Sequence, residues 1–148
     1  MRVPMQALHD GSRVMLRLDD GQDVFAALSQ VARNRGIRAA AVVSGIGMVK
    51  SAAVGFWTGR EYDVQNLDRP HELIGLQGSI ATLDEGPSIH LHAQLANERH
   101  QVVGGHLLRA TVGVVGEILL ETFPGKTFGR PLNESLGLRT LDLEPGPV

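Results

Sequence analysis

The sequence predicts an α+β fold: a single domain in which one early helix packs on a mostly antiparallel β-sheet. The chain has 148 residues, which is close to the commonest domain size. Its 18 glycines favour many turns and closely packed strands over a helical bundle. Successive strand patterns accompany a single helical pattern, with no internal repeat and no interdomain linker.

The first two predicted elements are a strand and a helix. Residues 12–18 alternate apolar and polar side chains, as a half-buried strand does. Asp20 or Asp23 can cap a helix that runs as far as Arg35, and Gly36 follows at the position where helices commonly end. The apolar stripe of this helix consists of Val24, Phe25, Leu28, Val31 and Ala32.

The middle of the chain predicts further strands. Residues 38–44 form a short apolar run typical of a buried strand, and residues 49–57 are expected to continue antiparallel to it after a bend at residues 45–47. Residues 58–70 are polar and predict a loop with a short strand, and residues 71–82 predict the next strand. The side chains expected to share one face of that strand are Ile74, Leu76 and Ile80.

Three more strands are predicted after a turn signal at residues 84–87. They cover residues 88–95, residues 102–108 and residues 111–122. The side chains of the last strand that are expected to face inward are Val112, Val114, Ile118 and Leu120.

Proline and glycine are frequent near the end of the chain, which predicts mostly irregular structure there. Residues 138–143 could add an edge strand. The domain is therefore expected to comprise residues 12–122, and residues 123–148 are expected to pack on it or trail from it as a C-terminal extension.

Composition and charge exclude several classes of function. Lys and Arg total 14 against 16 Asp and Glu, for a formal net charge of −2, and the arginines are scattered, which disfavours DNA binding by a lone chain. There is no cysteine, so disulfides and thiolate metal sites are excluded. No signal peptide and no run of about 20 apolar residues is present, which predicts a cytoplasmic protein without a membrane partner.

Two histidines share the polar face of one predicted strand. In residues 88–95 the alternation is complete, so His90 and His92 point to the same side while Leu91 points to the other. Side chains two residues apart have Cα atoms roughly 6.6 Å apart on a strand, which lets two imidazoles reach a common ion.

A third histidine can join them through a hairpin. Residues 96–101 are polar, and folding the chain back there brings His106 close to His92. Gly104 and Gly105 remove side-chain bulk, so that neighbouring backbone or a bound ligand can approach. A slip of one residue in the register would place His106 on the wrong face, and the sequence alone leaves that register open.

Three neutral imidazoles predict a site for zinc or another divalent metal, with a fourth position left for water, a carboxylate or a small-molecule ligand. The alternative is that the histidines are solvated residues on a polar face. If the site is catalytic, Asp84, Glu117 and Glu121 are general-base candidates by residue type only. The other histidines lack such partners and are expected at the surface, with His71 also a candidate for a position behind the site or at an interface: they are His9, His71 and His100.

Two short sequence motifs lack the surrounding residues that their binding functions require. The glycines of residues 45–47 do not make a dinucleotide-binding loop, because Lys50 stands where the third glycine is required and a strand follows. Gly129-Arg130-Pro131 matches part of an AT-hook, but the preceding arginine and basic surroundings are missing.

Five motifs occur in this order along the chain: Ser44-Gly45-Ile46-Gly47, His71-Glu72-Leu73-Ile74, Leu76-x-Gly78-Ser79-Ile80, Ile89-His90-Leu91-His92 and Val103-Gly104-Gly105-His106-Leu107. Together they resemble a known family, the plants-and-prokaryotes-conserved (PPC) domain, over residues 12–122. The resemblance implies an α+β homotrimer in which His90, His92 and His106 bind a metal, zinc where it has been identified. The family often carries a DNA-binding label because its plant members add AT-hooks, which this chain lacks.

Three functions remain open on the sequence. The chain could be a homotrimeric metal-binding module with a regulatory or small-ligand-binding role. It could be a metal-dependent enzyme, a hydrolase or lyase acting on a small polar substrate. It could also bind DNA through the surface of a trimer.

Overall fold

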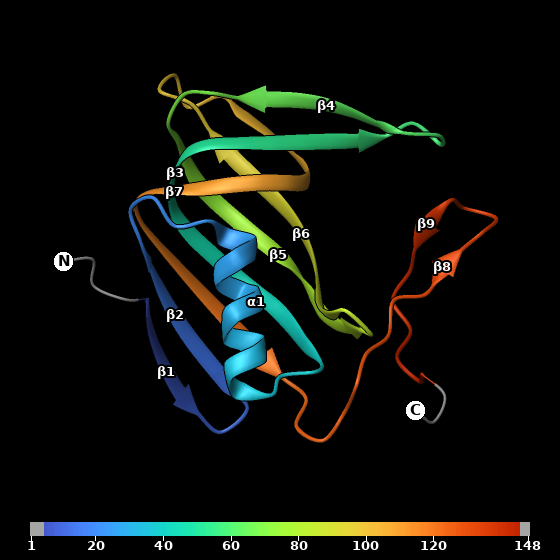
Figure 1. Ribbon diagram of the computed structural model, residues 1–148. Helices are drawn as coiled ribbons and strands as arrows, with labels where there is room; N and C mark the ends of the chain where they lie inside the picture. The colour runs from blue at the N-terminus through green and yellow to red at the C-terminus, as the bar shows by residue number, and fades with distance from the viewer. Residues whose placement is uncertain (1–4, 146–148) are drawn as a thin grey trace.

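The computed structural model describes residues 5–145, which form a seven-stranded antiparallel sheet with a single helix packed against it and a separate two-stranded sheet (Figure 1). The elements in chain order are β1 (Gln6–Asp10), β2 (Arg13–Asp19), α1 (Val24–Arg35), β3 (Ala40–Trp57), β4 (Tyr62–Leu67), β5 (His71–Leu83), β6 (Gly86–Ala96), β7 (Val102–Thr122), β8 (Leu132–Asn133) and β9 (Leu138–Arg139). Strands dominate, and every strand pairing in these residues is antiparallel, as predicted.

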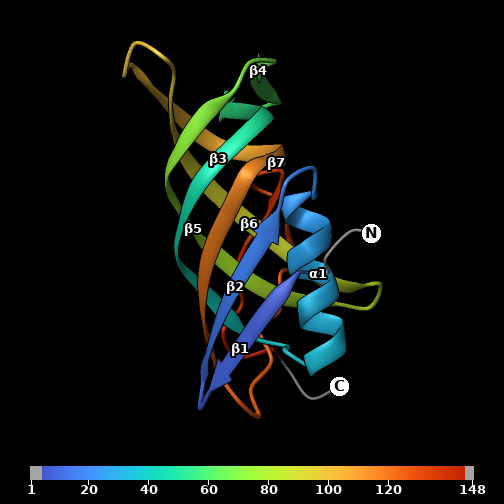
Figure 2. The ribbon, with the colours of Figure 1, turned by 90° about the vertical axis from the view of Figure 1, so that its left-hand side faces the viewer.

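Helix α1 begins and ends where the sequence predicts. The side chain of Asp23 accepts a hydrogen bond from the backbone N–H of Ala26 at 2.7 Å, and Gly36 adopts a left-handed conformation with φ of 63°. Its buried side chains are Val24, Ala27, Leu28, Val31 and Ala32. Phe25 is only partly buried, although it packs against the core. Figure 2 shows α1 on one side of the curved sheet, so the sheet is covered by a helix on one face.

The long strands β3 and β7 organise the sheet. They pair with each other over most of their length, from Ala40 opposite Thr122 to Gly55 opposite His106. β3 also pairs with β5, β5 with β6, and β6 with β7, so these four strands form a closed circuit of pairings. β2 and β1 extend the sheet beyond β7, and β4 extends it beyond β3.

The structure corrects the prediction of separate short strands. β3 runs without a break through residues 45–47, and β7 runs through residues 109–110, so each is one strand where two were expected. The chain does not reverse at Gly47, because irregularities in the ladder with β7 absorb the bend. β1 was not predicted, and the predicted edge strand at residues 138–143 is reduced to β9, which pairs with β8 and not with the main sheet.

Bulges also explain two side chains that point outward against expectation. Gly47 pairs with Gly116 and Met48 with Gly113, so Val114 lies in an extra stretch of β7, where it has φ of 64° and is 70% exposed. Ile74 lies at a register shift between β5 and β6 and is 51% exposed. The other members of both predicted faces are buried: Leu76, Ile80, Val112, Ile118 and Leu120.

The segment after β7 contacts Arg38 and the end of β5 through its backbone. The backbone N–H of Phe128 donates to the carbonyl of Arg38, and the N–H of Thr82 donates to the carbonyl of Phe128. Gly129 and Asp142 form a bridge further on. This path brings Arg130 to strand β6, where its Nε donates to Ser88 Oγ. Within residues 5–145, no helix is both long and apolar enough to cross a lipid bilayer.

Candidate metal centre and ligand pocket

Strand β6 presents its two histidines on the face opposite the core. Leu91, Ala93 and Leu95 are fully buried, whereas His90 is partly buried and His92 is exposed. Gly78 on β5 makes this position of β6 possible, because a Cβ there would lie 1.8 Å from the carbonyl oxygen of His90. The alternation expected from the sequence is therefore present.

His106 joins this pair through the predicted hairpin register. Its Cα lies opposite that of His92 in the β6–β7 ladder, and residues 97–101 form the connecting loop. The two preceding glycines make room for the backbones of the neighbouring strands, not for a ligand. A Cβ on Gly104 would lie 2.6 Å from the carbonyl oxygen of Ala93, and one on Gly105 would lie 2.8 Å from that of Gly55.

The three imidazoles converge. One ring nitrogen of each residue, His90, His92 and His106, lies within 4.8 Å of those of the other two. The ring centroids are separated by 5.1, 5.2 and 5.5 Å. Nitrogen atoms at this spacing need only small side-chain rotations to reach a common zinc ion with bonds of about 2.0–2.1 Å. The donor set therefore fits a divalent metal that prefers imidazole ligands.

Tyr62 fixes the third imidazole from the far side. Its ring stacks on that of His106 with a centroid separation of 4.5 Å and an interplanar angle of 12°. Gly55 provides the space, because a Cβ there would lie 2.9 Å from Cδ1 of Tyr62. Trp57 packs against Tyr62 in turn, at 5.2 Å between centroids. Sequence reasoning missed this support, because it depends on pairing between β3 and both β4 and β7.

The surroundings keep at least two of the imidazoles uncharged. Burial, with smaller contributions from Arg130, His106 and His92, lowers the pKa of His90 from 6.5 to about 4. Burial, followed by the charge of His92, also lowers the pKa of His106. A neutral imidazole retains the lone pair that a metal requires, so both residues are available as ligands at neutral pH.

The metal-free protein is expected to lose stability as the pH falls from 6.5 to about 4. The folded protein keeps His90 neutral over this range, whereas the unfolded chain takes up the proton near pH 6.5. The unfolded state therefore binds more protons, and the stabilising contribution that is complete above pH 6.5 is lost. Because His90 is partly exposed, we expect a loss of about 1–2 kcal/mol from this residue. Urea unfolding at pH 7 and pH 4 measures it. An equal loss in His90→Gln would contradict this origin.

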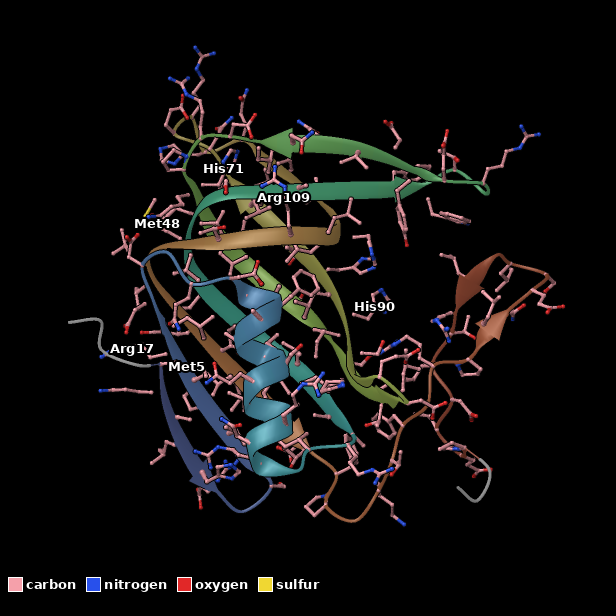
Figure 3. The ribbon with its side chains drawn as sticks, viewed as in Figure 1. Met5, Arg17, Met48, His71, His90 and Arg109 are labelled. Atoms are coloured by element: carbon pink, nitrogen blue, oxygen red, sulfur yellow. The ribbon has the colours of Figure 1, made fainter. Side chains whose placement is uncertain are left out.

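The three histidines lie in a pocket of about 550 Å³, a volume suited to a small molecule. Figure 3 shows His90 on the side of β6 that faces the C-terminal segment with β8 and β9. The pocket is lined by Gly55, Phe56, Trp57, Tyr62, Ile89, His90, His92, Gly105, His106, Arg130, Leu138 and Arg139. Most of the other lining side chains are aromatic or aliphatic, and within residues 5–145 no carboxylate lines this pocket.

A family model now accounts for most of the chain. The model of the Plants and Prokaryotes Conserved domain, abbreviated PCC or PPC, matches residues 5–124. The chain belongs to this family. The resemblance noted in the sequence is thereby confirmed, and the match ends before Arg130, Leu138 and Arg139, so part of the pocket of this PCC-domain protein lies outside the matched region.

Proteins from several organisms are similar to this chain. A candidate DNA-binding protein from Ralstonia eutropha JMP134 is 30% identical, with a TM-score of 0.85 over 93% of this chain and 95% of that one. A metal-containing protein from Archaeoglobus fulgidus is 31% identical, with a TM-score of 0.79 over 95% and 98% of the two chains. The Bifunctional protein GlmU of Synechococcus sp. (strain JA-2-3B'a(2-13)) is 30% identical over 133 residues, 88% of this chain. The chain spans only 20% of that protein's length.

Arg130 is the main site residue of this PCC-domain protein that sequence reasoning did not find. Its side chain is buried, and it donates hydrogen bonds to Ser88 Oγ and Ser79 Oγ, both at 3.0 Å. The partial AT-hook match therefore corresponds to an arginine inside the fold. Its only sequence signal was a charged residue between glycine and proline, which does not predict burial.

The remaining candidates lie away from the three histidines. None of the candidate general bases lines the pocket: Asp84 follows β5, Glu117 lies opposite Arg17 in the β2–β7 ladder, and Glu121 accepts a hydrogen bond from Ser12. His9 and His100 are exposed, as expected. His71 is not a surface residue: it is 8% exposed, its Nδ1 lies 2.8 Å from the carbonyl oxygen of Arg69, and Figure 3 shows it apart from His90.

Proposed function

We propose that this PCC-domain protein binds a divalent metal, zinc in the first place, through His90, His92 and His106, and presents it to a small-molecule ligand in the pocket. The protein then acts as a metal-dependent ligand-binding or regulatory module. The observation that carries the proposal is the convergence of three imidazole nitrogens within 4.8 Å at a pocket of small-molecule size.

The choice of metal follows from the donor set. Three imidazoles without a thiolate suit zinc, copper, nickel or iron, and zinc accepts three protein ligands with one position left open. When bound, a divalent metal supplies a Lewis acid that can hold an anionic or polar ligand atom. The chain itself supplies the orientation, because Tyr62 holds His106 and the backbone of β6 holds the other two histidines. The similarity to a metal-containing protein of Archaeoglobus fulgidus supports this assignment.

The pocket favours ligand binding over hydrolysis as the function. A hydrolase of this type needs a group that can accept a proton near the metal, usually a carboxylate or a free imidazole. Within residues 5–145 no Asp or Glu lines the pocket, and its three histidines are all assigned to the metal. The other ionisable groups there are Arg130, Arg139 and Tyr62, which suit binding and orientation.

The proposal includes self-association as a homotrimer, whose number of chains is taken from the family resemblance. Its structural support is an apolar surface on the sheet. Ile46 on β3 and Ile74 on β5 flank the Gly47–Leu73 pair, and they are 52% and 51% exposed. Val43 nearby on β3 is 48% exposed. Apolar side chains grouped in this way often mark surfaces that a partner covers.

DNA binding is the weaker candidate. It is favoured by the similarity to a candidate DNA-binding protein from Ralstonia eutropha JMP134. Against it stand the net charge of −2 and the burial of Arg130, which removes the one AT-hook-like arginine from the surface. Binding to phosphates depends on exposed cationic side chains, so we do not include DNA in the proposed function.

Native mass spectrometry of the zinc-treated protein tests the metal and the assembly together. We expect three chains with one zinc ion per chain, and isothermal titration of the metal-free protein should give the same stoichiometry. Absence of bound zinc after both treatments, in a folded protein, overturns the metal assignment. A monomer that carries zinc overturns the assembly alone.

A further inference from the structure

The C-terminal segment places a buried cation beside the three histidines. Arg130 is 6% exposed and lines the pocket, as does Arg139, whose Nη1 donates to the carbonyl oxygen of Arg130 at 3.0 Å. Both residues lie beyond residue 124, where the match to the family model ends. The cationic part of the pocket is therefore contributed by the segment that follows the matched domain.

The guanidinium of Arg130 is held in place but not neutralised. Its Nε donates to Ser88 Oγ, and its Nη2 donates to the hydroxyl and carbonyl oxygens of Ser79. Within residues 5–145, Nη1 has no hydrogen-bond acceptor, and no carboxylate lies within ion-pair distance of the side chain. Ser79 and Ser88 are neutral, so they orient the guanidinium without balancing its charge.

A buried charge without a counter-ion is unfavourable, and here it faces the proposed metal site, which would hold a second cation. Arg130 lines the same pocket as the three histidines, and its Nε donates to Ser88, which lies two residues before His90 on β6. The guanidinium and the imidazoles therefore face a common space. An anion between them would satisfy the free Nη1 donor and compensate the positive charge.

We propose that Arg130 is an anion-binding residue and that the pocket takes a small organic carboxylate. The carboxylate group would lie between Arg130 and the three histidines, and its apolar part would contact the remaining wall. The placement of the carboxylate beside the histidines rests on the proposed metal site, because a carboxylate oxygen is a suitable fourth ligand there. The contact with Arg130 does not depend on the metal.

The walls favour an organic carboxylate over a free inorganic anion. Trp57, Tyr62 and Leu138 line the pocket beside the polar groups, together with Ile89. An inorganic phosphate would reach the cationic groups but leave these apolar side chains without a partner. A carboxylate with an aromatic or aliphatic body uses both, and a pocket of about 550 Å³ has room for it.

Calorimetric titration with three probes tests this assignment: 3-phenylpropionate, its uncharged amide and inorganic phosphate. With wild-type protein loaded with zinc, we expect the carboxylate to bind at least 10-fold more tightly than either of the other two. Arg130→Gln should weaken carboxylate binding 10-fold or more. The carboxylate affinity of Arg130→Lys should fall between those of wild type and Arg130→Gln, since lysine retains the charge but not the planar, two-pronged guanidinium. Arg109→Gln, at an exposed arginine outside the pocket, is the control variant and should leave carboxylate affinity unchanged.

Equal carboxylate affinity in wild type and Arg130→Gln overturns the proposal, as does equal affinity for the amide. Tighter binding of phosphate than of the carboxylate overturns the ligand class. If Arg130→Gln does not fold, Arg130→Lys and the comparison of acid with amide in wild type still decide the question. The same titrations on metal-free protein separate the two proposals. If carboxylate binding requires Arg130 but is unaffected by zinc, the proposed contact between the carboxylate and the metal is overturned and the anion site at Arg130 is retained.

Discussion

Replacing His106 with alanine is expected to weaken zinc binding by at least about 100-fold. Mutation of a residue that only hydrogen-bonds to a metal ligand typically weakens metal affinity 10- to 100-fold. Removal of a direct ligand should therefore weaken zinc affinity at least as much. The two remaining histidines, His90 and His92, both come from β6, so the variant loses the member of this trio that β7 contributes. Competition titration with a zinc chelator measures the change.

His9→Ala is the matched control for that experiment. His9 is exposed on β1 and belongs to no cluster of metal-binding residues within residues 5–145, so its removal should leave zinc affinity unchanged. The melting temperature of metal-free His106→Ala should stay close to that of wild type, because the residue is only partly buried. A zinc affinity within threefold of wild type in His106→Ala would show that the three imidazoles do not act as one site.

Replacing Gly78 with alanine is expected to destabilise the protein by about 3 kcal/mol or more. The new Cβ would lie 1.8 Å from the carbonyl oxygen of His90, so strands β5 and β6 must separate locally. The clash involves backbone, which cannot move aside as a flexible side chain can. Since the affected residue is His90 itself, we also expect weaker zinc binding. Urea unfolding of the metal-free protein measures the first effect, and zinc titration measures the second.

Gly116→Ala provides the comparison for Gly78→Ala. Gly116 is likewise a glycine within a strand, and it is buried where Gly78 is partly buried, but a Cβ there would meet its nearest neighbour, Val112 Cγ2, at an ordinary 3.5 Å. We expect this variant to remain within about 1 kcal/mol of wild type. Similar stabilities for the two variants would show that β6 adapts to a side chain at residue 78.

The local parts of the fold could be predicted because neighbouring residues determine them. Asp23 and Gly36 mark the ends of α1 through interactions within a few residues of each other. His90 and His92 share a face because side chains on a strand alternate. The loop between β6 and β7 was equally visible, since polar residues separate two apolar patterns.

Predictions that assumed an unbroken alternation of side chains along a whole strand were less accurate. Val114 and Ile74 were assigned to the buried face, and both are exposed because a bulge changes the alternation next to them. A bulge depends on how two strands pair, so a single strand's pattern does not reveal it. The same limitation applied to residues 45–47, where glycine indicated a reversal and the structure has a continuous strand.

The residues alone predicted that two histidines lie side by side on one strand, that His106 follows one hairpin later, and which family the chain resembles. The folded structure was needed to show that His106 lies opposite His92, that Tyr62 stacks behind it, and that Arg130 is buried in the same pocket as His90. The physical reason is sequence separation: a register, a stacked ring and a buried arginine from the C-terminal segment all depend on contacts between distant segments. The candidate metal ligands could therefore be predicted from the sequence. The pocket around them could not.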